Sequence, residues 1–163
     1  MTVLAWAPWV LAVGVASWVL AVLAAPVLPA WPAAIVYGIS SLVCHQLPER
    51  SLYWGAVQFA VCSRCTGIYI GAAIAAVGAA AFEPARVAAL RPRVRALLIA
   101  GAAPTAVTVL AEWLGAWAPS HAVRLAAGLP LGASVLATVA VAMALNYEQW
   151  RSRPDEPRRP RKP

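Results

Sequence analysis

The chain has 163 residues, of which 62% are hydrophobic and 12% are charged, and its formal net charge is +7. A soluble domain contains about half apolar and about a quarter charged residues, and a particle of this size buries too little surface to hide such an apolar excess. The composition therefore excludes a soluble enzyme, a disordered binder and a disulfide-rich secreted domain. It indicates an all-α, polytopic membrane helix bundle whose surroundings are the lipid bilayer.

Four apolar runs are long enough to cross a bilayer, which takes roughly 20 residues. They cover about residues 3–23, 65–82, 96–117 and 122–145 of a single membrane domain, 1–150. Prolines at positions 26, 29 and 32 follow the first run, and a continuous helix does not tolerate them. The next apolar stretch, 33–43, is too short to span, so we expect a half-helix or an interfacial segment there.

The basic residues are divided unequally between the two ends of this four-span bundle. Three of them, Arg50, Arg64 and Arg124, fall at one end. The other ten fall in the loop between the second and third runs and in the tail 151–163: Arg86, Arg91, Arg93, Arg95, Arg151, Arg153, Arg158, Arg159, Arg161 and Lys162. Cytoplasmic loops are enriched in Lys and Arg, so we expect a multi-pass protein of the cell membrane with both termini in the cytoplasm.

The tail is rich in proline and charge and is predicted to be disordered. The arginines form no basic stripe with interleaved aromatics, so nucleic acid is not an expected partner.

The same model places every cysteine and histidine at the outward-facing end: Cys44, His45, Cys62, Cys65 and His121. The pair Cys62 and Cys65 stands where a loop becomes a helix. Thiolates at i and i+3, joined by a third ligand from another segment, are typical of tetrahedral zinc sites. We therefore predict a metal centre, with zinc preferred over Cu(I) or an iron–sulfur cluster, held by the three cysteines. His45, His121, a carboxylate or water supplies the fourth ligand.

Two other interpretations of the cysteines stay open. A CxxC at a helix start is also typical of a membrane thiol–disulfide oxidoreductase, because the helix N-terminus and Arg64 stabilise a thiolate. The third interpretation is a non-catalytic, metal-stabilised helper of other membrane proteins. The simplest alternative to all three is that the thiols only fill apolar gaps.

Charged side chains accompany the cysteines at this end. Such groups cost a few kcal/mol each at membrane depth unless they are paired, so ion pairing between Glu112 and the arginines that holds the helices together is one prediction. The functional alternative is that Arg50, Arg64 and Arg124 bind an anionic group such as a lipid phosphate. Metal-assisted hydrolysis or transfer on an anionic, lipid-linked substrate would follow, with Glu112 or Glu49 moving protons.

Two segments are more specific than the CxxC alone. Residues 44–51 read Cys-His-Gln-Leu-Pro-Glu-Arg-Ser, and residues 61–71 read Val-Cys-Ser-Arg-Cys-Thr-Gly-Ile-Tyr-Ile-Gly. They resemble the signature of the family called domain of unknown function 2085, CHQ-x-x-x-RS followed by C-x-RC-x-G-x-Y-x-G, which is found in small bacterial and archaeal membrane proteins.

The resemblance covers about residues 35–135 and extends more weakly to Pro104 and to Arg124, Gly128 and Gly132. The acidic residue that the family carries soon after the proline is absent from 105–108, and Glu112 is the nearest substitute. The resemblance implies a shared membrane site but no reaction. Gly67 and Gly71, like Gly128 and Gly132, are four residues apart, which predicts close helix packing.

Overall fold

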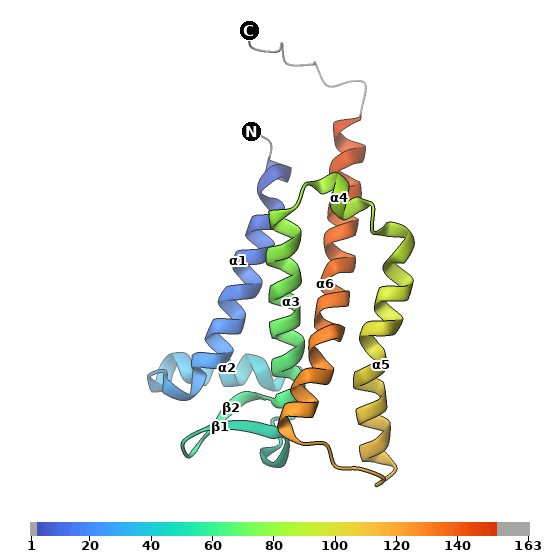
Figure 1. Ribbon diagram of the computed structural model, residues 1–163. Coiled ribbons are helices and arrows are strands. Elements are labelled where there is room, and N and C mark those ends of the chain that lie inside the picture. The colour runs from blue at the N-terminus through green and yellow to red at the C-terminus, as the bar shows by residue number, and fades with distance from the viewer. Residues whose placement is uncertain (1–2, 153–163) are drawn as a thin grey trace.

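The computed structural model describes residues 3–152 and consists of four long helices standing side by side (Figure 1). They are α1 (Val3–Ala24), α3 (Ser63–Ala81), α5 (Val94–Trp113) and α6 (His121–Arg151). All four are long and apolar enough to cross a membrane. The start of α1 and the end of α6 lie at one end of the bundle, here called the terminal end. The predicted all-α polytopic bundle is confirmed.

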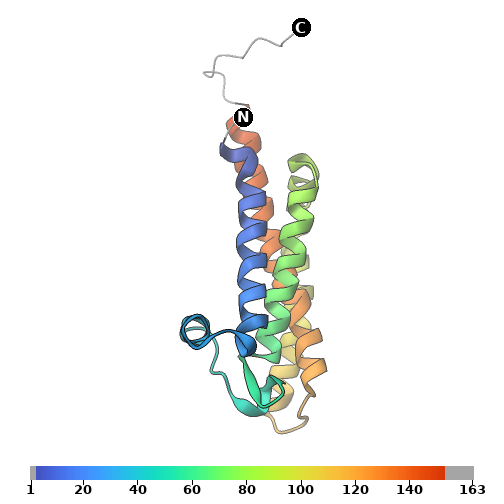
Figure 2. The ribbon, with the colours of Figure 1, turned by 90° about the vertical axis from the view of Figure 1, so that its left-hand side faces the viewer.

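A short helix, α2 (Ala30–Ser41), lies across the foot of α1 instead of along the bundle axis (Figures 1 and 2). It is the separate short segment predicted before Cys44. The chain breaks at the 3-10 turn η1 (Ala25–Val27) and at Pro29, which precedes α2. Pro32 lies within the first turn of α2, where its missing N–H costs no helical hydrogen bond. Trp31 is 80% exposed, and Ile35 and Ile39 are also exposed.

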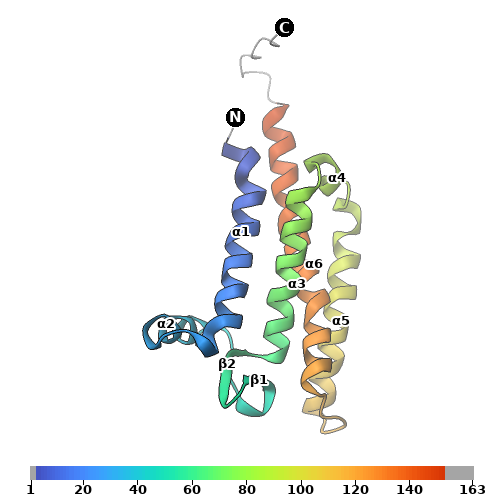
Figure 3. The same cartoon turned by 60° about the vertical axis from the view of Figure 1, so that its left-hand side comes forward.

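A β-hairpin follows α2 and was not predicted. It consists of β1 (Ser51–Trp54) and β2 (Val57–Cys62), preceded by the 3-10 turn η2 (Pro48–Arg50). The strands are antiparallel, with Trp54 opposite Val57, and Gly55 takes the positive φ of 59° that the turn requires. The hairpin lies below α1 and α3 and leads directly into α3 (Figure 3).

Two helix ends differ from the predicted spans. The third helix ends at Trp113, four residues early, because Gly115 adopts a φ of 66° just after it. The fourth continues to Arg151, beyond the expected end at 145. Residues 153–163 of the predicted disordered tail lie outside the described residues. At the terminal end, α4 (Pro84–Ala88) and the 3-10 turn η3 (Arg91–Arg93) connect α3 to α5.

The closest contact in the bundle lies between α3 and α6. Four glycines face the opposite backbone: Gly67 meets the carbonyl of Leu125, Gly71 that of Leu129, Gly128 that of Arg64 and Gly132 that of Ile68. A Cβ atom at any of these positions would overlap the facing carbonyl oxygen. The close helix packing predicted from the glycine spacing is confirmed: the two GxxxG motifs pack against each other and hold the start of α6 tightly beside the start of α3.

Candidate metal centre

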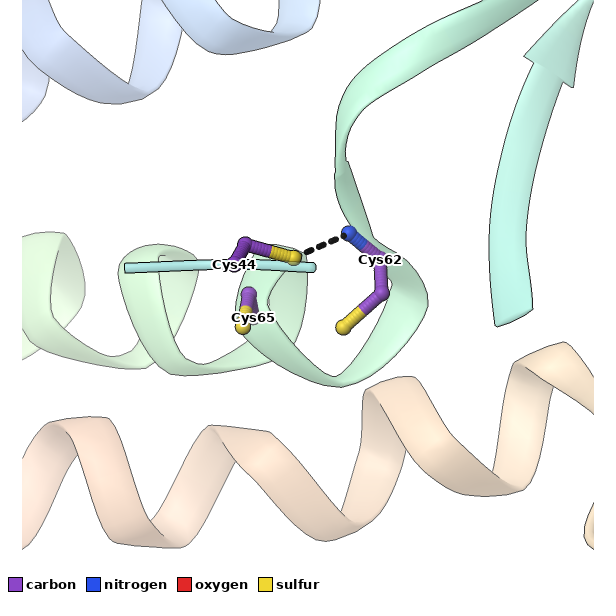
Figure 4. Close-up of side chains that lie close together, drawn as sticks. All are labelled: Cys44, Cys62 and Cys65. Carbon is purple, nitrogen blue, oxygen red and sulfur yellow. Dashed lines mark hydrogen bonds between the residues drawn. The ribbon is translucent and has the colours of Figure 1, made fainter. Parts of the chain in front are cut away.

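Three cysteines from separate segments meet beside the start of α3. Cys44 lies in the loop after α2, Cys62 ends β2, and Cys65 lies in the first turn of α3. Their Sγ atoms all lie within 4.8 Å of one another. Figure 4 shows them side by side, with the backbone N–H of Cys62 donating to Cys44 Sγ at 3.2 Å. The predicted convergence of the three cysteines is confirmed.

Gln46 holds the Cys44 loop in place. Its φ of 51° is positive, which is uncommon for a residue other than glycine. Its side-chain Nε2 donates to the carbonyl of Tyr37 at 2.9 Å and to that of Ala60 at 2.8 Å. Its own carbonyl accepts from Gln58 Nε2 at 2.6 Å. The loop is thus tied to α2 and β2, and these three hydrogen bonds contribute to fixing the position of Cys44. The sequence pattern did not indicate this role of Gln46, although Gln46 is the third residue of the CHQ motif.

The sulfurs lie in mainly apolar surroundings. Cys44 is 6% exposed and belongs to a buried cluster with Val22, Ala25, Val36, Ala60 and Val61, against which Cys62 and Cys65 pack. Hydrogen bonds from the side chains of Cys62 and Cys65 outweigh burial and hold the pKa of the Cys44 thiol well below its usual range. A lowered pKa favours the thiolate at Cys44, and the thiolate is the form that binds metals.

The two histidines have different environments. His45 is exposed on the loop next to Cys44. His121 opens α6, and its Nδ1 lies 3.0 Å from Ser63 Oγ. Ser63 Oγ also donates to the Arg50 carbonyl at 3.0 Å, so Nδ1 of His121 belongs to a hydrogen-bond network around Ser63. Among residues 3–152, the group of mutually close ligand atoms contains the three sulfurs and neither histidine.

A second cluster, of charged residues, joins α3, α5 and α6. Arg64 Nη2 donates to Glu112 Oε2 at 2.8 Å, while Arg124 donates to Oε1 through Nε at 2.8 Å and through Nη2 at 2.5 Å. The three side chains are only 13%, 7% and 10% exposed for Arg64, Glu112 and Arg124 respectively. Two guanidinium groups and one carboxylate leave this cluster with a net charge of +1.

The other two predicted site residues, Arg50 and Glu49, lie on η2. Arg50 contributes its backbone carbonyl to the hydrogen-bond network around Ser63, and Glu49 is exposed.

Comparison with known proteins shows the family to which the chain belongs. The model of a family described as "Predicted membrane protein (DUF2085)" matches residues 44–138. The chain belongs to this family. It is 33% identical over 90 residues to an uncharacterized protein of Methanothermobacter thermautotrophicus, a match that covers 55% of this chain and 78% of that protein. It is 50% identical over 36 residues to the uncharacterized protein MJ1492 of Methanocaldococcus jannaschii, a match covering 22% of this chain and 23% of that protein. No solved structure matches it.

Within the DUF2085 segment, the two clusters occupy different sides of the first turn of α3. Cys62 and Cys65 pack toward α1, α2 and β2, whereas Arg64, between them in sequence, reaches α5. The guanidinium groups of Arg64 and Arg124 are accordingly directed to Glu112 and do not surround the sulfurs. Ser63, which lies between Cys62 and Arg64 in sequence, is hydrogen-bonded to His121 at the start of α6. The family match begins at Cys44 and includes every residue of both clusters.

Proposed function

We propose that this DUF2085 protein binds one zinc ion through Cys44, Cys62 and Cys65 at the membrane surface. The observation that carries the proposal is the approach of three free thiols to within 4.8 Å. Sulfurs that share one zinc ion at about 2.3 Å lie roughly 4 Å apart, so only small side-chain movements are needed. Three thiolates leave one tetrahedral position for water or a substrate atom.

Charge balance supports a divalent ion at this site. Three thiolates and Zn²⁺ together carry a net charge of about −1. The cluster of Arg64, Glu112 and Arg124 carries one excess positive charge and is attached to the same turn of α3. Two opposite net charges on one helical turn reduce the cost of placing either of them at the membrane.

We further propose that the substrate is an anionic, lipid-linked molecule. Exposed aromatic side chains support this: Trp31 on α2 and Trp54 on the hairpin are the kind of residue that lies at the bilayer interface. We expect a lipid headgroup at that depth to meet the cysteine site and Arg50, because Arg64 and Arg124 are directed to Glu112. A bound metal would polarise a phosphoryl oxygen or activate water. Glu49 is better suited to the proton transfer, since both oxygens of Glu112 already accept from arginines.

A thiol–disulfide oxidoreductase is the second candidate, and one observation favours it. Cys62 is the N-cap residue of α3 and Cys65 follows within the first turn, so both free thiols lie at a helix N-terminus with Cys44 available to resolve a disulfide.

Metal analysis of the purified protein separates the two candidates. The full chain is purified in detergent with a reductant and without chelator, and zinc and free thiols are counted. We expect about one zinc per chain, reduced about tenfold or more in Cys44→Ser, Cys62→Ser and Cys65→Ser. Ser41→Ala, a change at an exposed position just before the Cys44 loop, is the control and keeps the metal. A protein without metal but with a reversible Cys62–Cys65 disulfide would support the redox function. A protein with neither the metal nor the disulfide would reject both candidate functions.

A further inference from the structure

The terminal end of the bundle contains a cavity far from the cysteines. It has a volume of about 430 Å³ and lies between α1, α3, α4 and α6. Six of its fifteen lining residues are alanines, among them Ala76, Ala79 and Ala80 on α3 and Ala140 and Ala144 on α6. Here α1 packs along α3 and makes little contact with α6. Because alanine side chains are too short to fill the resulting gap, the space remains open.

The cavity has an apolar interior and a polar rim. Leu11 and Met143 extend the apolar wall, whereas Asn146 and Tyr147 bring polar groups near the end of α6. Its volume lies within the roughly 300–1,000 Å³ typical of small-molecule sites. Such a site favours a ligand with an apolar body and a polar head.

Positive charge surrounds this rim. The Arg151 guanidinium lies over the ring of Tyr147, 5.7 Å from its centroid. Arg86 is exposed on α4 between Pro84 and Val87, which both line the cavity. The described part of this end carries five arginines (Arg86, Arg91, Arg93, Arg95 and Arg151) against two acids, Glu83 and Glu148. The polar head that fits this rim is therefore an anion.

We propose that the cavity binds one acyl chain of an anionic phospholipid whose phosphate contacts Arg86 and Arg151. An acyl chain matches the apolar walls, and each nearby Lys or Arg favours an anionic headgroup over a neutral one. This site is at the opposite end from the metal centre and does not depend on the function proposed for it. The lipid here is a bound ligand held between helices, distinct from the bilayer that surrounds the bundle.

Trp9 provides a direct probe, because it lines the cavity. The full chain in non-ionic detergent is titrated with phosphatidylglycerol carrying brominated acyl chains, which quench nearby tryptophans. We expect a saturable loss of fluorescence that disappears in Trp9→Phe. Trp6→Phe, one turn away and absent from the cavity lining, is the control and keeps it. Brominated phosphatidylcholine should need about tenfold more lipid or worse to give the same loss.

Two further variants test the apolar cavity and the two arginines separately. Ala80→Phe fills the cavity and should abolish the saturable component. Arg86→Gln combined with Arg151→Gln leaves the cavity intact and should remove the preference for phosphatidylglycerol. Arg95→Gln, at the same end but on α5, is the matched control and should retain it. Equal quenching by both lipids, or a saturable loss that survives in Trp9→Phe, would overturn the proposal. The proposal would also be overturned if the saturable quenching disappeared when the chain self-associates, because a second copy of the chain would then occupy the cavity.

Discussion

Arg64 and Glu112 are 48 residues apart in sequence, and their side chains form a 2.8 Å ion pair that joins α3 to α5. Arg124 reaches the same carboxylate from α6, so three helices meet at one buried acid. Removing one member of such a group leaves an uncompensated charge at membrane depth. The pairing therefore fixes the ends of these helices beside the cysteine site.

Glu112→Gln should destabilise the protein strongly. The amide removes the negative charge and leaves two buried guanidinium groups without a counterion, a change that costs about 3–5 kcal/mol. Thermal unfolding in detergent measures the loss. Glu83→Gln, an exposed acid at the start of α4, should change stability by less than about 0.5 kcal/mol. Equal stability of the Glu112 variant and the parent would show that the pairing contributes nothing.

Gly71→Ala and Gly132→Ala should each separate α3 from α6. The added methyl group would overlap the carbonyl oxygen of Leu129 or of Ile68, and backbone atoms cannot move aside as side chains can. We expect a loss of about 1–3 kcal/mol or more in thermal unfolding.

Gly78→Ala is the matched control for the glycine variants. It lies on the same helix as Gly71, and its Cβ would meet nothing within 4 Å. Alanine favours a helix over glycine by about 1 kcal/mol, so this variant should be neutral or stabilising. A similar loss in all three variants would mean that helix packing is not the cause.

Gln46→Ala should weaken metal binding while all three cysteines remain. It removes both side-chain hydrogen bonds that tie the Cys44 loop to Tyr37 and Ala60. Residues that position a metal ligand typically contribute about 10–100-fold in affinity. Competition with a zinc indicator measures the change, and Gln149→Ala, at an exposed position on α6, should bind as the parent does. An unchanged zinc affinity would show that Cys44 holds its position without Gln46.

His121→Ala and His45→Ala should both retain zinc in the stoichiometry of the parent. His45 is exposed, and Nδ1 of His121 is engaged by Ser63, so the three sulfurs hold the ion in the proposed site. Zinc counting on the purified variants tests this. Loss of the metal in His121→Ala alone would instead make Nε2 of that residue the fourth ligand.

Labelling with a membrane-impermeant maleimide tests the predicted orientation. Ala116→Cys places a thiol in the exposed loop between α5 and α6, at the cysteine end, and Ser152→Cys places one at the terminal end. In intact cells we expect the first to be labelled above the parent's background and the second only after lysis, because the arginine-rich end should face the cytoplasm. The reverse pattern would invert the proposed topology.

Composition and hydropathy were sufficient to predict the four spans and the short segment before Cys44, because a bilayer demands long apolar helices whatever their neighbours are. The glycine spacing likewise predicted close packing of helices. The hairpin was not predicted: β1 and β2 are short, and Gln58 of β2 is hydrogen-bonded to Gln46 in the cysteine loop, a contact that a local sequence pattern does not show.

Which residues meet was decided by the tertiary structure. The sequence by itself determined a membrane bundle with its cysteines, histidines and Glu112 toward one end, since charge and hydropathy act along the chain. Only the packing of α3 between its neighbours directed Cys62 and Cys65 toward Cys44 and Arg64 toward Glu112. Successive residues on a helix face different directions, so adjacency in sequence could not distinguish one shared pocket from two clusters. The cavity at the terminal end was likewise decided by the tertiary structure, because a gap between helices cannot be predicted from the sequence of any one helix.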